Sequence, residues 1–161
     1  MIIRYGDGLM DNHDVRHATF VFERASDAPI DRVFAALANP VERAQWGVPS
    51  EKAALVYERA DFREGGSDVF RCGPKHDPQY RGVTTYLDIV PNSRIVSTEL
   101  VEANGRKLLA TMSTTTLEPR GAGTNITVTL HVTSLAGQDM IKGAENGTGA
   151  SLDNLVRTLG E

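Results

Sequence analysis

The sequence predicts an α+β domain in which an antiparallel sheet packs against helices on one face. Two observations support this fold class. Strand-like segments follow one another with only short turn signals between them, which is typical of antiparallel hairpins. The last such segment, Thr124–Val132, is followed by one long helical segment that ends at Leu159. The apolar stripe of that helix must be buried against another element, and the sheet is the available surface.

Composition is that of an ordinary single domain. The chain has 161 residues, of which 40% are hydrophobic and 24% charged. A net charge of −4 argues against sequence-independent binding to nucleic acid or to an anionic membrane surface. We expect no membrane-spanning segment and no signal peptide. Cys72 is the single cysteine, so an internal disulfide is excluded and a cytoplasmic location is expected.

The first part of the chain is expected to form a loose extension, a strand and a helix. Residues 1–15 are polar, glycine-containing and aperiodic, so we place the single domain at residues 16–161. The segment His17–Ser26 alternates and is rich in strand formers. Pro29 suits the first position of a helix, and the apolar residues after it recur with a helical period. These residues are Ile30, Val33, Phe34 and Leu37.

A second, short helix should follow directly and end near Trp46. Asn39 can cap it, Pro40 suits its first position, and Glu42 has the spacing of a capping box. Six further strands are expected after it, with the Gly65-Gly66 pair as one of several turn signals. The expected strands are Ala53–Phe62, Ser67–Gly73, Tyr80–Val90, Arg94–Val101, Lys107–Glu118 and Thr124–Val132.

The inner face of the last strand but one is unusually polar. If Leu109 and Leu117 face inward, so do Thr111, Ser113 and Thr115. A buried hydroxyl without a partner costs roughly 1–3 kcal/mol, so a row of them is unfavourable in a dry core. The row therefore indicates a pocket that holds water or a polar ligand group. The alternative is that these side chains bond to the backbone or only satisfy strand propensity.

The C-terminal helix points to the same pocket. Its second half is densely apolar, whereas its first half contains Gly143, Gly147 and Gly149. Each glycine inside a helix costs about 1 kcal/mol relative to alanine. We infer that the second half packs as core while the first half covers a cavity. A helix broken near Gly147 is the alternative.

Seven stretches of the chain are similar to one protein superfamily: His17–Arg24, Ala28–Ala36, Gln45-Trp46, Asp61–Gly66, Tyr86–Val96, Leu117–Pro119 and Gly147–Leu155. They resemble START-like (SRPBCC) proteins, in the branch named after the C-terminal domain of the activator of the heat-shock-protein-90 ATPase. The likeness covers about residues 17 to 160. It implies a helix-grip fold, in which a curved antiparallel sheet of about seven strands surrounds a long C-terminal helix and two short helices follow the first strand. In this superfamily the cavity between sheet and helix holds lipids, steroids, polyketides or plant aromatics, and some members are cyclases or hydrolases.

Candidates for catalysis are few, and we expect no catalytic residue, metal or cofactor. Cys72 as a nucleophile would need an activating base, and on the inner face with Phe70 it reads as a small buried hydrophobe. His131 points outward by the alternation of its strand. The His76-Asp77 pair lies in a turn, and a metal site there would need more ligands. Asp88 and Arg94 are expected to pair across a hairpin in a structural role. Glu99, Glu102 and Arg106 are interpreted as solvated charges at strand ends.

We therefore predict a protein that binds a small hydrophobic or amphiphilic molecule between the sheet and the C-terminal helix. One alternative is a cyclase- or hydrolase-type enzyme that uses the same cavity, which an inward His76 or Tyr86 beside an acidic group would favour. The other is a co-chaperone or stress-response module with a chaperone partner, and a homodimer also stays open. The expected ligand-binding residues are Trp46, Phe70, Cys72, Thr85, Leu87, Thr111, Ser113, Thr115, Met140, Gly147 and Ser151.

Overall fold

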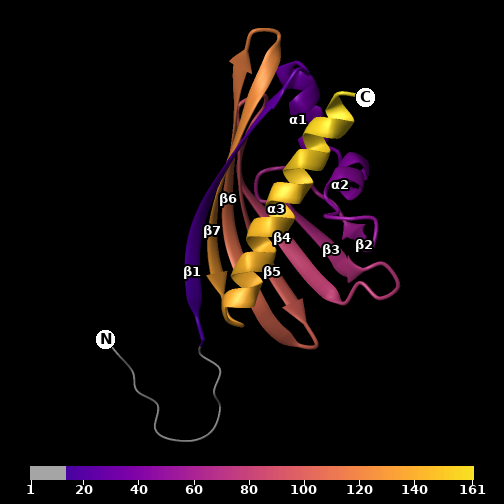
Figure 1. The fold of residues 1–161 in the computed structure, drawn as a ribbon, viewed down its shortest axis with the longest axis vertical. Coiled ribbons are helices and arrows are strands. Elements are labelled where there is room, and N and C mark those ends of the chain that lie inside the picture. The colour runs from indigo at the N-terminus through magenta and orange to yellow at the C-terminus, as the bar shows by residue number, and fades with distance from the viewer. Residues whose placement is uncertain (1–13) are drawn as a thin grey trace, which may run out of the picture.

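The computed structural model describes residues 14–161, and residues 1–13, most of the expected N-terminal extension, lie outside the described residues. Within residues 14–161 the chain forms seven strands and three helices (Figure 1). They are β1 Arg16–Ser26, α1 Ile30–Ala38, α2 Pro40–Trp46, β2 Ala53–Arg59, β3 Ser67–Pro74, β4 Tyr80–Val90, β5 Arg94–Ala103, β6 Arg106–Arg120, β7 Gly123–Ser134 and α3 Gln138–Leu159. Every expected element is present. The largest difference is that β2 ends at Arg59, three residues earlier than the pattern indicated.

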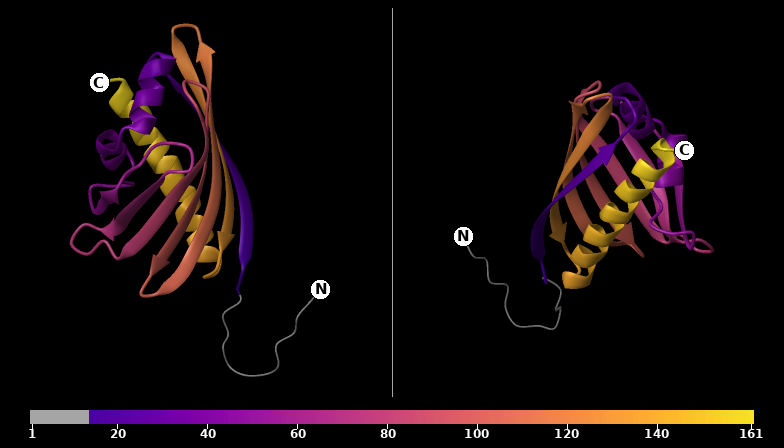
Figure 2. Two further views of the ribbon diagram at one scale, coloured as in Figure 1. Left: turned by 180° about the vertical axis from the view of Figure 1, so that it is seen from behind. Right: turned by 45° about the horizontal axis from the view of Figure 1, so that its top comes forward.

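All the described strands belong to one antiparallel sheet, in the order β1-β7-β6-β5-β4-β3-β2. The first strand pairs with the last, so β1 and β2 are the two edges of the sheet. Figure 2 shows that the sheet is curved and that all three helices lie on its concave side. The predicted α+β class and helix-grip architecture are confirmed.

The turn between β5 and β6 shows why the hairpins could be located from sequence. Asn104 and Gly105 both have positive φ, 54° and 72°. Two consecutive positive φ values are what a type I′ hairpin turn requires, and Asn-Gly is the pair that best tolerates them. Asn92, between β4 and β5, also has a positive φ of 60°.

The helix starts differ in detail from the expectation. The Asn39 side chain accepts a hydrogen bond from the Val41 amide at 2.9 Å, so the predicted N-cap of α2 is confirmed. The capping box is not formed, because the Glu42 carboxylate pairs instead with Arg32 at 2.9 Å. Pro29 precedes the first helical residue of α1 and serves as its N-cap position, with an extended backbone. Helix α3 is continuous from Gln138 to Leu159, so the broken-helix alternative is wrong.

The apolar core is divided into two clusters. One lies between the sheet, α1 and the C-terminal half of α3, and it includes Leu117 and Leu155. The other lies near the N-terminal half of α3 and includes Leu109 and Ile141. Strand β6 contributes to both clusters, and the residues between its two core leucines are the hydroxyl row. The second half of α3 is core, as predicted, since Leu155 is completely buried.

Helix α3 lies nearest to β1 and β7 and crosses the concave face towards α1 and α2 (Figure 1). On the β1 side, Arg24 pairs with Asp153 at 2.6 Å. On the other side, the Ser151 hydroxyl donates to the Gly47 carbonyl at 2.9 Å, and the Asn154 amide donates to the Val48 carbonyl at 2.7 Å. These bonds fix the C-terminal half of the helix on both flanks.

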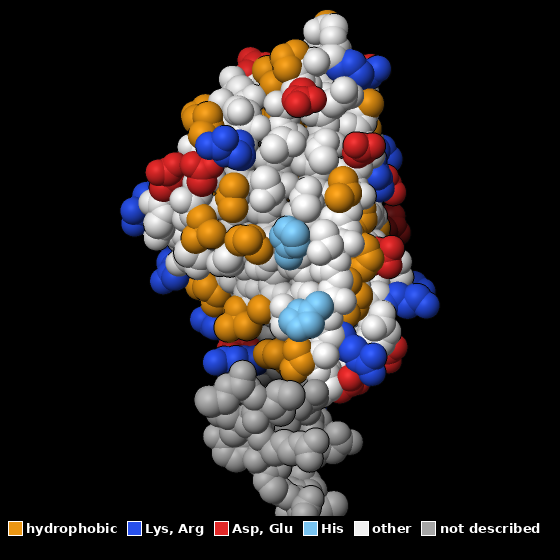
Figure 3. Space-filling view, turned by 90° about the vertical axis from the view of Figure 1, so that its left-hand side faces the viewer, with side chains coloured by type: hydrophobic (Ala, Val, Ile, Leu, Met, Phe, Trp, Pro, Cys, Tyr) orange, Lys and Arg blue, Asp and Glu red, His pale blue; other side chains and the backbone are white. Residues whose placement is uncertain are grey.

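The convex face of the sheet is open to solvent and weakly charged. Figure 3 shows hydrophobic, histidine and uncoloured (neither apolar nor charged) surface over much of this face, with most charged side chains towards its rim. Val21, Leu87 and Met112 are among its exposed apolar residues. No helix within residues 14–161 is both long and apolar enough to cross a membrane.

Candidate ligand site on the concave face

A group of polar side chains occupies the middle of the concave face, which we call the concave patch. It consists of Thr84, Ser97, Glu99, Thr111, Ser113 and Thr115. The register places them side by side: Glu99 lies opposite Thr84 on one neighbour and opposite Thr111 on the other. Ser113 pairs with Leu130 of β7, whose buried side chain marks the inner face. All six side chains are only partly buried although they lie on the helix side of the sheet.

The flank of α3 that faces away from β1 carries little side-chain bulk. Gly149 faces β1, because a Cβ placed there would lie 3.6 Å from the Phe22 ring. Gly147, two residues earlier, points to the opposite flank because successive helical residues are turned by about 100°. A Cβ at Gly147 would meet no atom within 4 Å, although the residue is half-buried. Open space therefore borders this part of the helix.

The structure places most of the predicted binding residues on the expected side. Phe70 and Cys72 on β3 and the three hydroxyl residues of β6 face inward. On α3, Met140 packs against the second core cluster and Ser151 is bonded to Gly47. Whether these residues contact a ligand stays a prediction.

The prediction was wrong for Thr85 and Leu87. The inward residue of this part of β4 is Tyr86, which is 5% exposed, whereas Leu87 is 51% exposed on the convex face. A β-bulge between Tyr86 and Asp88 follows and brings Ile89 inward. The sequence was ambiguous here because apolar residues stand next to each other. The polar network described below decides the register, because it holds the Tyr86 hydroxyl inside.

Two aromatic residues that were predicted to bind the ligand, Phe70 and Trp46, pack against other parts of the protein. The Phe70 ring lies directly over Gly82 of β4, since a Cβ there would be only 2.0 Å from its Cζ atom. Phe70 also packs against the Tyr57 ring, with centroids 6.0 Å apart. The Trp46 indole donates to the Ala36 carbonyl at 3.1 Å and packs against the first core cluster. Position 82 thus requires glycine, because the Phe70 ring lies against it. The Trp46 hydrogen bond fixes α2 to α1.

Sequence reasoning missed a buried polar network beside the concave patch, where Asp68 of β3 lies opposite Thr84 of β4. Its centre is Asp68 on β3, which pairs with Arg43 of α2 at 2.7 Å. Asp68 also accepts from the Tyr86 hydroxyl at 2.5 Å and from the Asp61 amide at 2.8 Å. The Arg43 guanidinium in addition donates to the Tyr57 hydroxyl at 3.2 Å and to two carbonyls at the end of α1. Because both charged groups are fully partnered, the network joins α1, α2 and the sheet.

The phenols in this network remain protonated at neutral pH. Burial raises the pKa of Tyr86. The positive charge of Arg43 lowers this pKa, whereas the hydrogen bond to Asp68 and the negative charge of Asp68 raise it further. Burial also raises the pKa of Tyr57, against the opposing effect of Arg43. Both side chains therefore act as hydrogen-bond partners and packing groups rather than as proton donors to a reaction.

Sequence reasoning also placed Glu99 wrongly. It is not a solvated strand-end charge, because it stands in the middle of β5 and faces inward. Its Oε2 atom accepts a hydrogen bond from the Thr84 hydroxyl at 3.2 Å. Burial raises the pKa of Glu99, the Thr84 hydrogen bond lowers it, and the nearby Asp68 charge raises it. The alternation of Ile95 and Val101 as inward residues was the signal that could have placed it.

Cys72 has the properties of a structural thiol, as the sequence indicated. It is half-buried on the inner face and is not in a disulfide. Burial, with a further contribution from the negative charge of Glu99, raises the pKa of Cys72 to about 11. The thiolate is the nucleophilic form, so such a thiol is not activated for catalysis.

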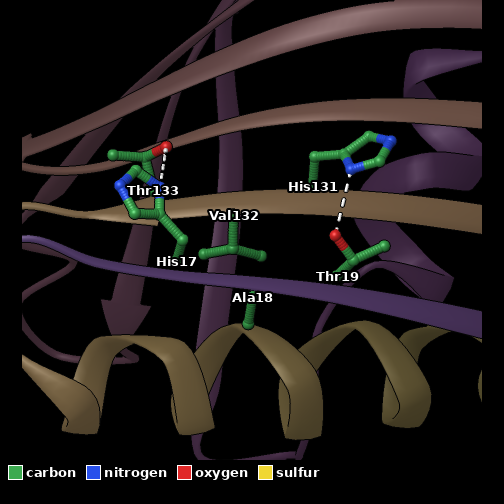
Figure 4. A pocket seen from close by; sticks show the side chains of 6 residues that line it. All are labelled: His17, Ala18, Thr19, His131, Val132 and Thr133. Atoms are coloured by element: carbon green, nitrogen blue, oxygen red, sulfur yellow. Dashed lines mark hydrogen bonds between the residues drawn. The ribbon is translucent and has the colours of Figure 1, made fainter.

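The described histidines lie elsewhere. His131 faces outward, as predicted, and its Nδ1 lies 3.1 Å from the Thr19 hydroxyl. His17 contacts Thr133 in the same way at 3.3 Å, and both pairs border a shallow depression between β1 and β7 (Figure 4). His76 is exposed in the turn after β3. Within residues 14–161 no three histidine, cysteine or acidic side chains are grouped as metal ligands.

A curved antiparallel sheet that grips a long C-terminal helix, with a partly solvated polar patch between them, defines a START-like helix-grip protein. The sequence profile described as "Activator of Hsp90 ATPase homolog 1-like protein" matches residues 27–160. The chain belongs to this family.

Solved structures with the same fold support the assignment. An uncharacterised protein from Rhizobium leguminosarum is 31% identical, with a TM-score of 0.78, and the match covers 90% of this chain and 95% of that one. The Mll3558 protein from Rhizobium loti is 34% identical, with a TM-score of 0.77, and the match covers 90% and 99%. The CV1439 protein from Chromobacterium violaceum is 26% identical, with a TM-score of 0.75 and coverage of 88% and 96%. Comparison with curated proteins gave no significant match.

Proposed function

We propose that this protein binds a small hydrophobic or amphiphilic molecule between the concave face of the sheet and helix α3. The observation that supports it best is the position of the concave patch. Polar side chains that remain partly exposed separate two apolar clusters, on the face that the helix covers. A molecule seated there would place apolar groups against the clusters and polar groups against the hydroxyl row.

The open flank of α3 supports the same proposal. Gly147 is half-buried, yet no side chain of another element lies within 4 Å of a Cβ built there, and the Ser151 hydroxyl one turn later is hydrogen-bonded to the Gly47 carbonyl. A well-packed core would place a bulky aliphatic side chain at such a position, because protein interiors are close-packed. The glycine therefore favours a space that is kept for a guest molecule.

The enzyme alternative is weaker. Tyr86 does lie inside beside an acidic group, which is the arrangement that would favour it. However, Asp68 is already neutralised by Arg43, and Tyr86 is 5% exposed, so neither group can reach a substrate. Within residues 14–161, Glu99 is the remaining inward acid on the sheet, and one partly accessible carboxyl group can bind or protonate a molecule but supplies no nucleophile–base pair.

A partner role rests on the family description, which refers to the activator of the Hsp90 ATPase. The weakly charged convex face would be the surface to offer to another protein. Stimulation of a purified chaperone ATPase by this protein would favour that role, and no stimulation together with ligand binding would favour the carrier.

The binding proposal is tested by thermal shift and native mass spectrometry against a library of lipids, steroids and aromatic compounds. The variant Ser113→Leu fills the middle of the concave patch, and Thr114→Leu adds the same bulk on the opposite face of the same strand. We expect Ser113→Leu to abolish binding and Thr114→Leu to retain it. No binding by wild type across the library, or equal binding by both variants, would rule the proposal out.

A further inference from the structure

In the described part of the chain, Glu99 differs from Asp68, the fully buried acid of the concave face, because it has no cationic partner. Asp68, the other acid on this face, is held by Arg43, the Tyr86 hydroxyl and a backbone amide. Among residues 14–161, no lysine, arginine or histidine lies within ion-pair distance of Glu99. Its described side-chain partner is the Thr84 hydroxyl, although a carboxylate offers about four acceptor positions. The described side chains thus use only a small part of the hydrogen-bonding capacity of Glu99.

The surroundings of Glu99 leave its charge unbalanced. The charge of nearby Asp68 is already balanced by Arg43, and the phenol of Tyr57 and the thiol of Cys72 are neutral at physiological pH, so none of these groups compensates the Glu99 carboxylate. The neighbouring strand residue Thr111 is uncharged. On the covering helix, the inward and patch-side residues are uncharged as well: Met140, Ala144, Gly147, Thr148 and Ser151. A partly desolvated carboxylate without a cationic partner is unfavourable, so this position favours either a proton or a cation from outside.

Glu99 remains partly exposed to solvent, so a molecule from outside can reach it. The residue is half-buried rather than buried, and its neighbours Ser97 and Ser113 are also half-buried. Apolar clusters lie on both sides along β6. An ammonium group placed on the carboxylate would therefore extend its hydrocarbon part against Leu109 or Leu117.

We propose that the bound molecule is a lipophilic amine whose ammonium group pairs with Glu99, and that anions of the same shape are rejected. This inference rests on the proposed binding site and specifies its ligand class. The ammonium group donates charge-assisted hydrogen bonds to Glu99, and the hydroxyls of Ser97 and Ser113, which lie on the same face two positions along the sheet, can accept its remaining protons. A fatty acid would place its carboxylate next to the negative charge of Glu99, which opposes binding.

The test compares three probes of equal chain length: octylamine, 1-octanol and octanoate. Each is titrated at about pH 7.5 into wild type, Glu99→Gln and the control Glu102→Gln by isothermal calorimetry. At this pH an alkylamine is protonated, since its pKa resembles that of lysine, and octanoate is ionised. Glu102 is a suitable control because it lies on the same strand but is paired with Arg81 at 3.5 Å.

We expect wild type to bind octylamine roughly tenfold to a hundredfold more tightly than octanoate, the range that one charge-assisted pair provides. Glu99→Gln should remove this preference and leave 1-octanol affinity within about twofold, whereas Glu102→Gln should behave as wild type. In wild type, octylamine affinity should fall on acidification as the proton competes for Glu99, and this needs no variant to fold.

Contrary results separate the two proposals. Equal affinity for the three probes, or an equal loss of amine binding in both variants, overturns the amine inference and leaves the binding site intact. Octanoate as the tightest probe overturns it as well. Absence of binding for all three probes to wild type overturns the amine inference, and the binding proposal is overturned as well only when the lipid, steroid and aromatic library also gives no binding.

Discussion

The Arg43–Asp68 pair allows a quantitative test of the polar network. Both side chains are buried, with 8% and 2% of their surface exposed. Replacing Arg43 by methionine removes the guanidinium but leaves Asp68 as an uncompensated charge beside the Tyr86 hydroxyl. Breaking a buried pair in this way lowers the free energy of unfolding by about 3–5 kcal/mol. For a domain of this size that corresponds to a fall in Tm of about 6–20 °C.

The double variant Arg43→Met with Asp68→Leu separates the pair from its surroundings. Each single variant leaves one buried charge, but the double variant leaves none. It should therefore lose clearly less than the sum of the single losses. It should not reach wild type, because the Tyr86 hydroxyl and the Asp61 amide lose their acceptor, at about 1–3 kcal/mol for each unsatisfied group.

Urea unfolding followed by circular dichroism and by Trp46 fluorescence measures these values. Arg94→Met is the matched control, because Arg94 pairs with Asp88 at 2.5 Å on the exposed surface and should unfold close to wild type. A loss below about 1 kcal/mol for Arg43→Met, or strictly additive single losses, would refute the argument that this pair is desolvated and coupled.

Three further predictions follow from single contacts. Glu99→Gln should raise the free energy of unfolding at about pH 8, because burial holds the folded-state pKa of Glu99 above its unfolded value. In denaturant titrations this gain should disappear as the pH falls below about 4.3, where the carboxyl group is protonated in both states. A gain that is the same at every pH would contradict this reasoning. Gly143→Ala should stabilise the protein by about 1 kcal/mol, since the added Cβ meets no atom of another element. Gly82→Ala should destabilise it by about 1–3 kcal/mol, because the added Cβ clashes with the Phe70 ring. If thermal unfolding shows that both variants change the stability in the same direction, the packing argument is wrong. Alkylation of Cys72 by iodoacetamide at about pH 8 should be roughly a hundredfold slower than that of a free thiol and should accelerate with pH, because burial raises its pKa to about 11; a rate equal to that of free cysteine would contradict it.

The order of elements could be predicted because local chemistry specifies it. Asn104-Gly105 and the alternation in β7 each have one good structural solution, and both were located correctly. The hydroxyl row of β6 was also placed on the inner face correctly, because Leu109 and Leu117 fix its register at both ends.

The polar network could not be predicted in the same way. Arg43 and Asp68 are 25 positions apart, and on a sequence each reads as a solvated charge. Only the tertiary arrangement shows that α2 carries the arginine over β3. The inward position of Tyr86 depends on that arrangement, and so the outward positions of Thr85 and Leu87 could not be derived from strand alternation alone.

The pairing of the first strand with the last has a consequence for synthesis on the ribosome. β1 cannot form its backbone hydrogen bonds until β7 has been synthesised, because Ser26 pairs with Thr124 and Arg16 pairs with Ser134. At translation rates of about 5–20 residues per second this delay is roughly 5–20 s. Until then the backbone groups of β1 lack their partner strand, and its apolar side chains stay uncovered until α3, which follows all seven described strands, has been synthesised.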